Sequence, residues 1–142
     1  MTALHSRSLL DLAPPDLRAY LEHVRSEEGL NFLLDDRLPC DPEPETRAFL
    51  YRAAQEILMN VRTHADASGV EVTLMARDGT HVIRIRDDGV GFEVTEALRA
   101  RPGHLGLAAL SERLEQAGGA LRIESAPGAG ATVEIEVPWG PI

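Results

Sequence analysis

The chain of 142 residues contains no lysine, and all 14 of its basic residues are arginine. A phosphate-binding P-loop ends in Gly-Lys-Ser/Thr, and protein kinases hold the nucleotide with a lysine on a strand. The absence of lysine therefore excludes both of these ATP-binding classes. If the protein binds a nucleotide, it must hold the phosphates in another way, and backbone amides can do so without a basic surface.

Other features are scarce as well. The single cysteine, Cys40, excludes an internal disulfide framework and fits a reducing cytosol. No apolar run approaches the roughly 20 residues of a membrane span, and the N-terminus lacks the apolar core of a signal peptide. The net charge of −9 argues against nonspecific binding to nucleic acid or anionic membranes. We therefore expect a cytoplasmic domain that binds no nucleic acid and reaches a membrane only through other parts of a longer protein.

Two helices are expected in the first half of the chain. Leu17, Leu21 and Val24 recur at helical spacing, and a short strand is expected at residues 31–34. A longer amphipathic helix is predicted over residues 45–66. Its apolar stripe comprises Phe49, Ala53, Ile57 and Val61.

The second half of the chain alternates in hydrophobicity, which predicts strands. Asp78 and Gly79 form a hairpin turn signal, and Gly118 with Gly119 ends a helix. The expected elements are strands at 70–74 and 82–86, a mobile loop at 92–102, a helix at 104–117 and strands at 120–125 and 132–137. Strand pairs alternate with helices, so we expect an α+β fold, a two-layer α/β sandwich whose mixed, mostly antiparallel sheet carries helices on one face.

Glu56 and Asn60 lie one helical turn apart on the longer helix and point into the same space. An amide oxygen suits Mg²⁺, which combines a few protein oxygens with waters and phosphate oxygens. The neighbouring carboxylate could hold a metal-bound water or accept a proton from a nucleophile. Such pairs are also common on helix faces that only contact solvent, so this pair alone does not define a site.

The segment Asp87–Gly91, with the sequence Asp-Asp-Gly-Val-Gly, follows a predicted strand. Gly89 and Gly91 let the backbone approach a planar ligand, and a carboxylate here can accept a hydrogen bond from an amine such as that of adenine. An ordinary Asp-Gly turn is the alternative. The segment is not the glycine-rich fingerprint of a dinucleotide-binding fold, because Val94 stands where the third glycine would be.

The segment Gly103–Leu107, with the sequence Gly-His-Leu-Gly-Leu, opens the next predicted helix. Unpaired N–H groups and the positive end of the helix dipole bind phosphate, and Gly103 and Gly106 would allow a close approach. The alternative is a plain glycine-marked helix boundary, at which His104 would be an ordinary surface residue.

In this order, the three motifs resemble the N box and the two glycine boxes of the GHKL superfamily of ATP-binding domains. Residues 51–60, followed by His64 and Ala65, resemble the N box of two-component sensor histidine kinases of the NarL/DesK type. The likeness extends over roughly residues 9–139. It implies a Bergerat-type fold that binds ATP and Mg²⁺.

The resemblance also implies a role for each matching position. Asn60 would coordinate Mg²⁺, and Glu56 would lie at the metal as the catalytic residue that activates the phosphoacceptor or a water. Asp87 would bind the adenine amino group. The other expected nucleotide-binding residues are His64, Gly89, Gly91, Gly103, His104, Gly106 and Leu107.

The sequence departs from the family pattern at two places. Thr63 stands before the N-box histidine, where the family often has Lys or Arg. The last hairpin has Ala131 where the family usually has Thr, and Thr132 follows one residue later, facing the other way unless a bulge shifts it. The first departure removes a basic contact to phosphate at that position, and from the second we expect weaker adenine binding than is typical.

The resemblance finally divides the chain and implies its partners. Residues 1–41 resemble the tail of a dimerisation helix and a linker, and residues 42–142 resemble the catalytic domain. Neither His5 nor His23 lies in a phosphoacceptor motif. We expect a fragment of a histidine protein kinase that phosphorylates a separate dimerisation domain, with a response regulator as the next acceptor. The alternatives are a free-standing anti-sigma-factor-like serine kinase or regulatory module, and a degenerate pocket used only for interaction.

Overall fold

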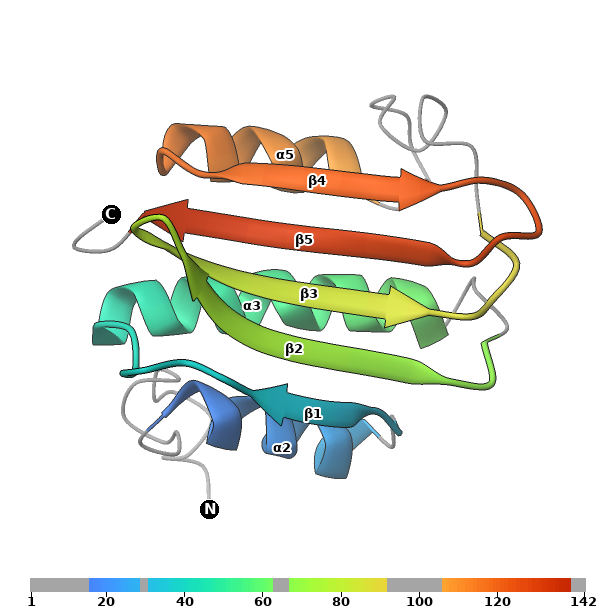
Figure 1. Ribbon diagram of the computed structural model, residues 1–142, viewed down its shortest axis with the longest axis horizontal. Helices are drawn as coiled ribbons and strands as arrows, with labels where there is room; N and C mark the ends of the chain where they lie inside the picture. Colours follow the sequence, from blue (N-terminus) through green and yellow to red (C-terminus); the bar gives the residue numbers. More distant parts are fainter. Residues whose placement is uncertain (1–15, 29–30, 63–66, 92–105, 139–142) are drawn as a thin grey trace, which may run out of the picture.

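The computed structural model describes residues 16–28, 31–62, 67–91 and 106–138. These residues form one five-stranded sheet with three helices packed behind it (Figure 1). The helices are α2 (Leu17–Glu28), α3 (Pro44–Asn60) and α5 (Leu107–Gln116). The strands are β1 (Leu33–Asp36), β2 (Val70–Arg77), β3 (Thr80–Asp87), β4 (Ala120–Ser125) and β5 (Ala131–Pro138).

The sheet has the strand order β1-β2-β3-β5-β4. β1 runs parallel to β2, and every other neighbouring pair is antiparallel. Asp78 and Gly79, with φ values of 50° and 80°, join β2 to β3, as a hairpin turn with two positive φ angles requires. The predicted α+β class, with a mixed, mostly antiparallel sheet covered by helices on one face, is therefore confirmed.

The core lies between the sheet and its helices. Successive side chains of a strand point to opposite faces, so every second residue faces the helices. α3 contributes the longest buried face and crosses behind the middle of the sheet (Figure 1). The strand residues with 1% exposure or less on the helix side are Val72, Leu74, Ile83, Ile85, Ile135 and Val137.

α2 belongs to the same core as α3. Leu21 and Val24 are fully buried, and the ring of Tyr20 lies 5.0 Å from that of Tyr51 on α3. The backbone N–H of Leu17 donates to the Asp41 carboxylate over 2.9 Å, which fixes the start of α2. The folded unit therefore begins no later than Leu17, and the boundary predicted at residue 41 does not coincide with a gap in the packing.

The predicted elements differ from the observed ones mainly at their ends. α3 ends at Asn60 and is followed by a wider, π-type turn at residues 61–62, and the helix end expected at residue 66 lies outside the described residues. α5 begins at Leu107 because Gly106 has a φ of 76°, which lies outside the helical range. The loop predicted at 92–102 lies outside the described residues.

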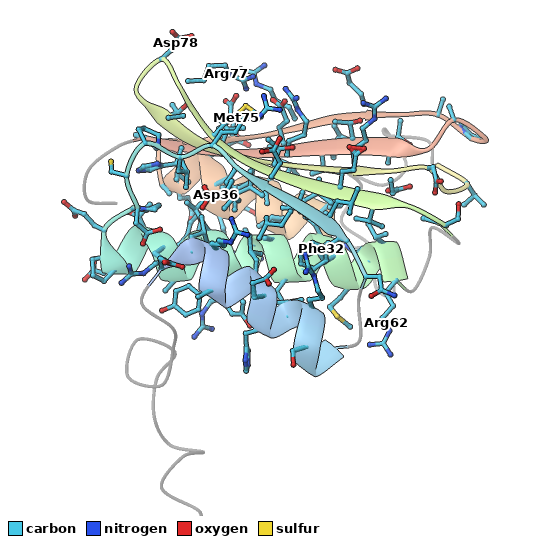
Figure 2. The ribbon with its side chains drawn as sticks, turned by 60° about the horizontal axis from the view of Figure 1, so that its bottom comes forward. Phe32, Asp36, Arg62, Met75, Arg77 and Asp78 are labelled. Atoms are coloured by element: carbon cyan, nitrogen blue, oxygen red, sulfur yellow. The ribbon has the colours of Figure 1, made fainter. Side chains whose placement is uncertain are left out.

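The face of the sheet away from the helices carries a network of arginine and glutamate side chains (Figure 2). Arg77 pairs with Glu134 at 2.8 Å and with Glu136 at 2.6 Å, and Arg84 pairs with Glu134 at 2.8 Å. Burial alone would raise the pKa of Glu134, but the hydrogen bonds from Arg77 and Arg84 outweigh it, and the pKa is lowered. This face is thus charged and internally paired. None of the helices in the described part of the chain has the length and apolar composition needed to cross a membrane.

Candidate functional site

α3 and α5 bring the first and third motifs together. Arg113 of α5 donates to Oε2 of Glu56 over 2.6 Å. A Cβ built on Gly106, at the start of α5, would lie 3.4 Å from Oε1 of the same carboxylate. Glu56 therefore lies against the beginning of α5, although the two are far apart in the sequence.

Asn60 is the last residue of α3, one turn beyond Glu56, and it is partly buried. The two side chains share the end of the helix that approaches the start of α5. Sequence spacing predicted this common face, because residues four apart on a helix are neighbours. A carboxylate and an amide are thus carried by the same end of α3.

Asp87 ends β3 and is only 8% exposed. Its Oδ1 accepts a hydrogen bond from the backbone N–H of Gly89 over 2.8 Å. Burial raises the pKa of Asp87, the hydrogen bond from Gly89 opposes the rise, and the neighbouring charge of Asp88 adds to it. A buried acceptor at the end of a strand fits recognition of a donor such as an amino group.

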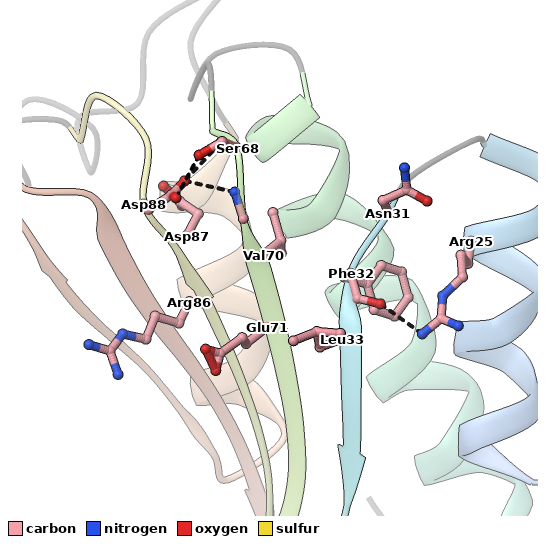
Figure 3. A pocket seen from close by; sticks show the side chains of 11 residues that line it. Arg25, Asn31, Phe32, Leu33, Ser68, Val70, Glu71, Arg86, Asp87 and Asp88 are labelled. Carbon is pink, nitrogen blue, oxygen red and sulfur yellow. Dashed lines mark hydrogen bonds between the residues drawn. The ribbon is translucent and has the colours of Figure 1, made fainter.

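The side chain of Asp88, unlike that of Asp87, is hydrogen-bonded to the chain that enters β2 (Figure 3). Its carboxylate accepts hydrogen bonds from the backbone N–H and hydroxyl of Ser68, both at 2.8 Å, and from the N–H of Gly69 at 2.9 Å. These bonds, that from Gly69 first, lower the pKa of Asp88. Asp88 therefore anchors the end of β3 to the chain entering β2 and thereby positions Asp87. Sequence reasoning missed this contact, and the only signal was a second acid beside the first.

The turn between β4 and β5 holds the glycine segment in place. Gly91 has a φ of 69°, and a Cβ there would come within 2.1 Å of the Ala126 carbonyl oxygen. A Cβ on Gly130 would lie 2.5 Å from the Asp87 carbonyl oxygen, and the N–H of Gly128 donates to Val90 over 2.5 Å. Gly91 is therefore required by packing within the protein itself. That Gly91 also makes room for a base stays a prediction.

The register between β3 and β5 determines which residue of the last hairpin lies opposite Asp87. Ala131 of β5 is directly opposite Asp87, and Thr132 is opposite Arg86. The ladder runs without a bulge from Thr80 to Asp87, so Thr132 points to the other face. The prediction that no threonine hydroxyl accompanies Asp87 from this strand is confirmed.

A groove of about 730 Å³ is lined in part by Asp87 and Asp88 and lies between the end of α2, the starts of β1 and β2 and the end of β3 (Figure 3). Neither Glu56 nor Asn60 lines it. Arg25, at its rim, donates to the Phe32 carbonyl over 2.8 Å and lies 4.8 Å from the centre of the Phe32 ring. This arginine thus holds the chain that leads into β1.

The remaining predicted site residues are placed only in part. Leu107 is buried at the first turn of α5, and Gly89 contributes its N–H to Asp87. His64, Gly103 and His104 lie outside the described residues.

Residues 45–141 match the family model described as histidine kinase-, DNA gyrase B-, and HSP90-like ATPase. The nitrate/nitrite sensor protein NarQ of Escherichia coli is 32% identical over 124 residues, which cover 86% of this chain and 21% of NarQ. The sensor histidine kinase LiaS of Bacillus subtilis is 30% identical over 149 residues, which cover 91% of this chain and 41% of LiaS. The chain thus spans less than half the length of either relative.

Solved structures show the same fold. A histidine kinase domain from the blue-light activated histidine kinase of Erythrobacter litoralis superposes with a TM-score of 0.70 at 22% identity. The superposition covers 87% of this chain and 65% of that domain.

Proposed function

Because the chain belongs to the family of histidine kinase-, DNA gyrase B-, and HSP90-like ATPases, we propose that it supplies the γ-phosphoryl group of ATP to a histidine on a separate dimerisation domain. A response regulator would be the next acceptor. The observation that carries this proposal is the contact of Glu56 on α3 with the start of α5 at Gly106. It joins the N box to the second glycine box, as a nucleotide pocket between them requires.

Asp87 would recognise the adenine of ATP. Its carboxylate, buried at the end of β3, accepts one hydrogen bond from Gly89 and would accept another from the exocyclic amino group. Gly106 and Leu107 would offer the phosphates the first backbone N–H groups of α5, which have no partner within the helix. His64, Gly103 and His104 would complete these contacts.

Mg²⁺ fits the donors at the end of α3. Asn60 would supply an amide oxygen, and Glu56 would supply a carboxylate that holds the metal directly or through water. In the described part of the chain, no three His, Cys, Asp or Glu side chains gather to hold a metal without further ligands. Mg²⁺ needs few protein ligands when phosphate oxygens provide the rest, and it then offsets phosphate charge.

Glu56 would act as the general base once the phosphoacceptor histidine comes within hydrogen-bond reach.

We assign α2 and β1 to the ATP-binding unit because they share its core and sheet. The dimerisation-helix tail would then lie before Leu17 rather than extend to residue 41. A cytoplasmic setting is part of the proposal and is consistent with an exposed free thiol at Cys40. Both relatives described above are sensor proteins by name, so the anti-sigma-like alternative has no observation in its favour.

The proposal is tested by titrating the full chain with ATP in a calorimeter, with and without Mg²⁺. Asn60→Ala should weaken Mg·ATP binding by about 1–3 kcal/mol, the range expected for one lost polar contact to a charged group. Arg52→Ala, an exposed change on the same helix, is the matched control and should bind as the wild type does. Without metal, Asn60→Ala and wild type should bind ATP alike. Equal affinities with metal present would contradict the role of Asn60, and no ATP binding by the wild type would contradict the function.

A further inference from the structure

The carboxylate of Glu56 lies against α5. Oε2 accepts the hydrogen bond from Arg113 at 2.6 Å, and Oε1 lies beside Gly106. The side chains of Arg113 and Glu56 are 52% and 38% exposed, so this ion pair adds little to the stability of the fold. We therefore look for an effect of this ion pair on ligand binding at the start of α5 rather than on stability.

The geometry of α5 explains how Arg113 reaches this position. Arg113 follows Gly106 by seven residues, or about two turns and 10 Å of helix rise. Side chains lean toward the N-terminus of their helix, so the long arginine extends back toward the start of α5. Among the described residues, Arg113 is the one basic side chain paired with Glu56.

The position of Glu56 creates an electrostatic conflict. Its carboxylate lies at the start of α5, where the proposed function places the phosphates of ATP. Like charges at such short range repel, and the repulsion is strong where water is excluded. A bare carboxylate here would oppose the binding of a triphosphate.

We propose that Arg113 is a charge-compensating residue, which neutralises and positions Glu56 so that a polyphosphate can bind beside it. The proposal rests on the function proposed above and adds a residue to it. Arg113 acts through Glu56, because the carboxylate repels the phosphates only when the guanidinium of Arg113 is removed. The predicted effect is therefore conditional on the negative charge of Glu56.

The test is a double-mutant cycle, measured by calorimetric titration of the full chain with adenosine, Mg·ADP and Mg·ATP. Arg113→Ala should weaken Mg·ATP binding about tenfold, Mg·ADP less, and adenosine not at all, because only the phosphates carry charge. Arg113→Lys should keep most of the affinity. Adding Glu56→Gln to Arg113→Ala should restore Mg·ATP binding to within about threefold of Glu56→Gln alone, since the uncompensated charge is then gone.

Arg122→Ala is the matched control, because Arg122, an exposed side chain of β4, also pairs with a glutamate, Glu136 of β5. It should leave all three affinities unchanged. A loss for Arg113→Ala that persists in the Glu56→Gln background would overturn the proposal, because Arg113 would then contact the phosphates itself. An equal loss for adenosine, or no loss for Mg·ATP, would overturn it too. If the wild type binds no Mg·ATP, the proposed function fails and this inference fails with it, whereas normal binding that ignores Arg113→Ala removes the inference alone.

Discussion

Two adjacent acids at the end of β3 show how position decides the behaviour of a residue. Asp87 faces the helices, is buried, and has its pKa raised mainly by that burial. Asp88 points the other way, and hydrogen bonds from Gly69 and Ser68 lower its pKa. One carboxylate is thus buried at the end of the strand, and the other fixes the backbone that presents it. The alternation of side chains along a strand is enough to separate the two tasks.

Gly91 provides a prediction at the same scale. Gly91→Ala should destabilise the protein by roughly 2 kcal/mol or more, because it adds a clash with the Ala126 carbonyl to the strain of a positive φ. Gly128→Ala is the matched control, because Gly128 also has a positive φ, of 81°, but a Cβ there meets no atom within 4 Å. Urea denaturation of both variants separates the two terms. Equal losses for the two would show that the close contact at Gly91 is not significant.

Among the elements, α2 packs into the same core as α3 although it lies before residue 42. Its buried face comprises Leu17, Tyr20, Leu21 and Val24. Leu21→Ala should therefore cost about 2–5 kcal/mol in unfolding free energy, as is usual for a large side chain removed from a core. Leu33→Ala in β1 should cost roughly 0.5 kcal/mol or less, because Leu33 is 73% exposed.

The comparison is made by denaturant unfolding monitored by circular dichroism. A loss for Leu21→Ala no larger than that for Leu33→Ala would mean that α2 is only loosely attached to the core.

Local patterns predicted most of the elements because their signals are local. The Asp78–Gly79 turn requires two positive φ angles, and the apolar period of α3 follows from helix geometry. The placement of α2 could not be predicted in this way. Its apolar period fits a dimerisation helix as well as a helix packed on α3, and long-range contacts such as that between Tyr20 and Tyr51 distinguish the two.

The residues of the candidate site could be predicted from the sequence, but the contacts between them could not. Glu56, Asn60 and Asp87 stand in short motifs, so their residue types could be read from the sequence. The bond from Arg113 to Glu56 and those from Ser68 to Asp88 join side chains that are distant in the chain. Such contacts depend on how elements pack, which no local pattern specifies.

For the molecule as a whole, stability should fall as the pH drops below about 6.5. His81 is 5% exposed, and burial lowers its pKa from the usual value of 6.5, with the charge of Asp41 opposing the shift in part. The unfolded chain then takes up a proton before the folded one, so protonation favours unfolding. The lowered pKa values of Asp88 and Glu134 also reduce stability as the pH falls, but only at a pH near or below 4. The raised pKa of Asp87 has the opposite effect on stability.

Urea denaturation between pH 7.5 and pH 5.5 checks this prediction. His81→Gln should flatten the slope of unfolding free energy against pH in this window. His23→Gln, at an exposed position of α2, should keep the slope of the wild type. A slope that is unchanged in His81→Gln would assign the pH dependence to another group.

The central claim is that this domain binds ATP through a carboxylate that reads adenine, and calorimetric titration with Mg·ATP and Mg·GTP tests it most directly. We expect the wild type to bind one ATP and to prefer it to GTP, and Asp87→Asn to lose affinity for ATP more than for GTP. Asp78→Asn, in the β2–β3 turn, is the matched control and should keep the preference. Failure of the wild type to bind ATP, or an unchanged preference for ATP in Asp87→Asn, would contradict the account.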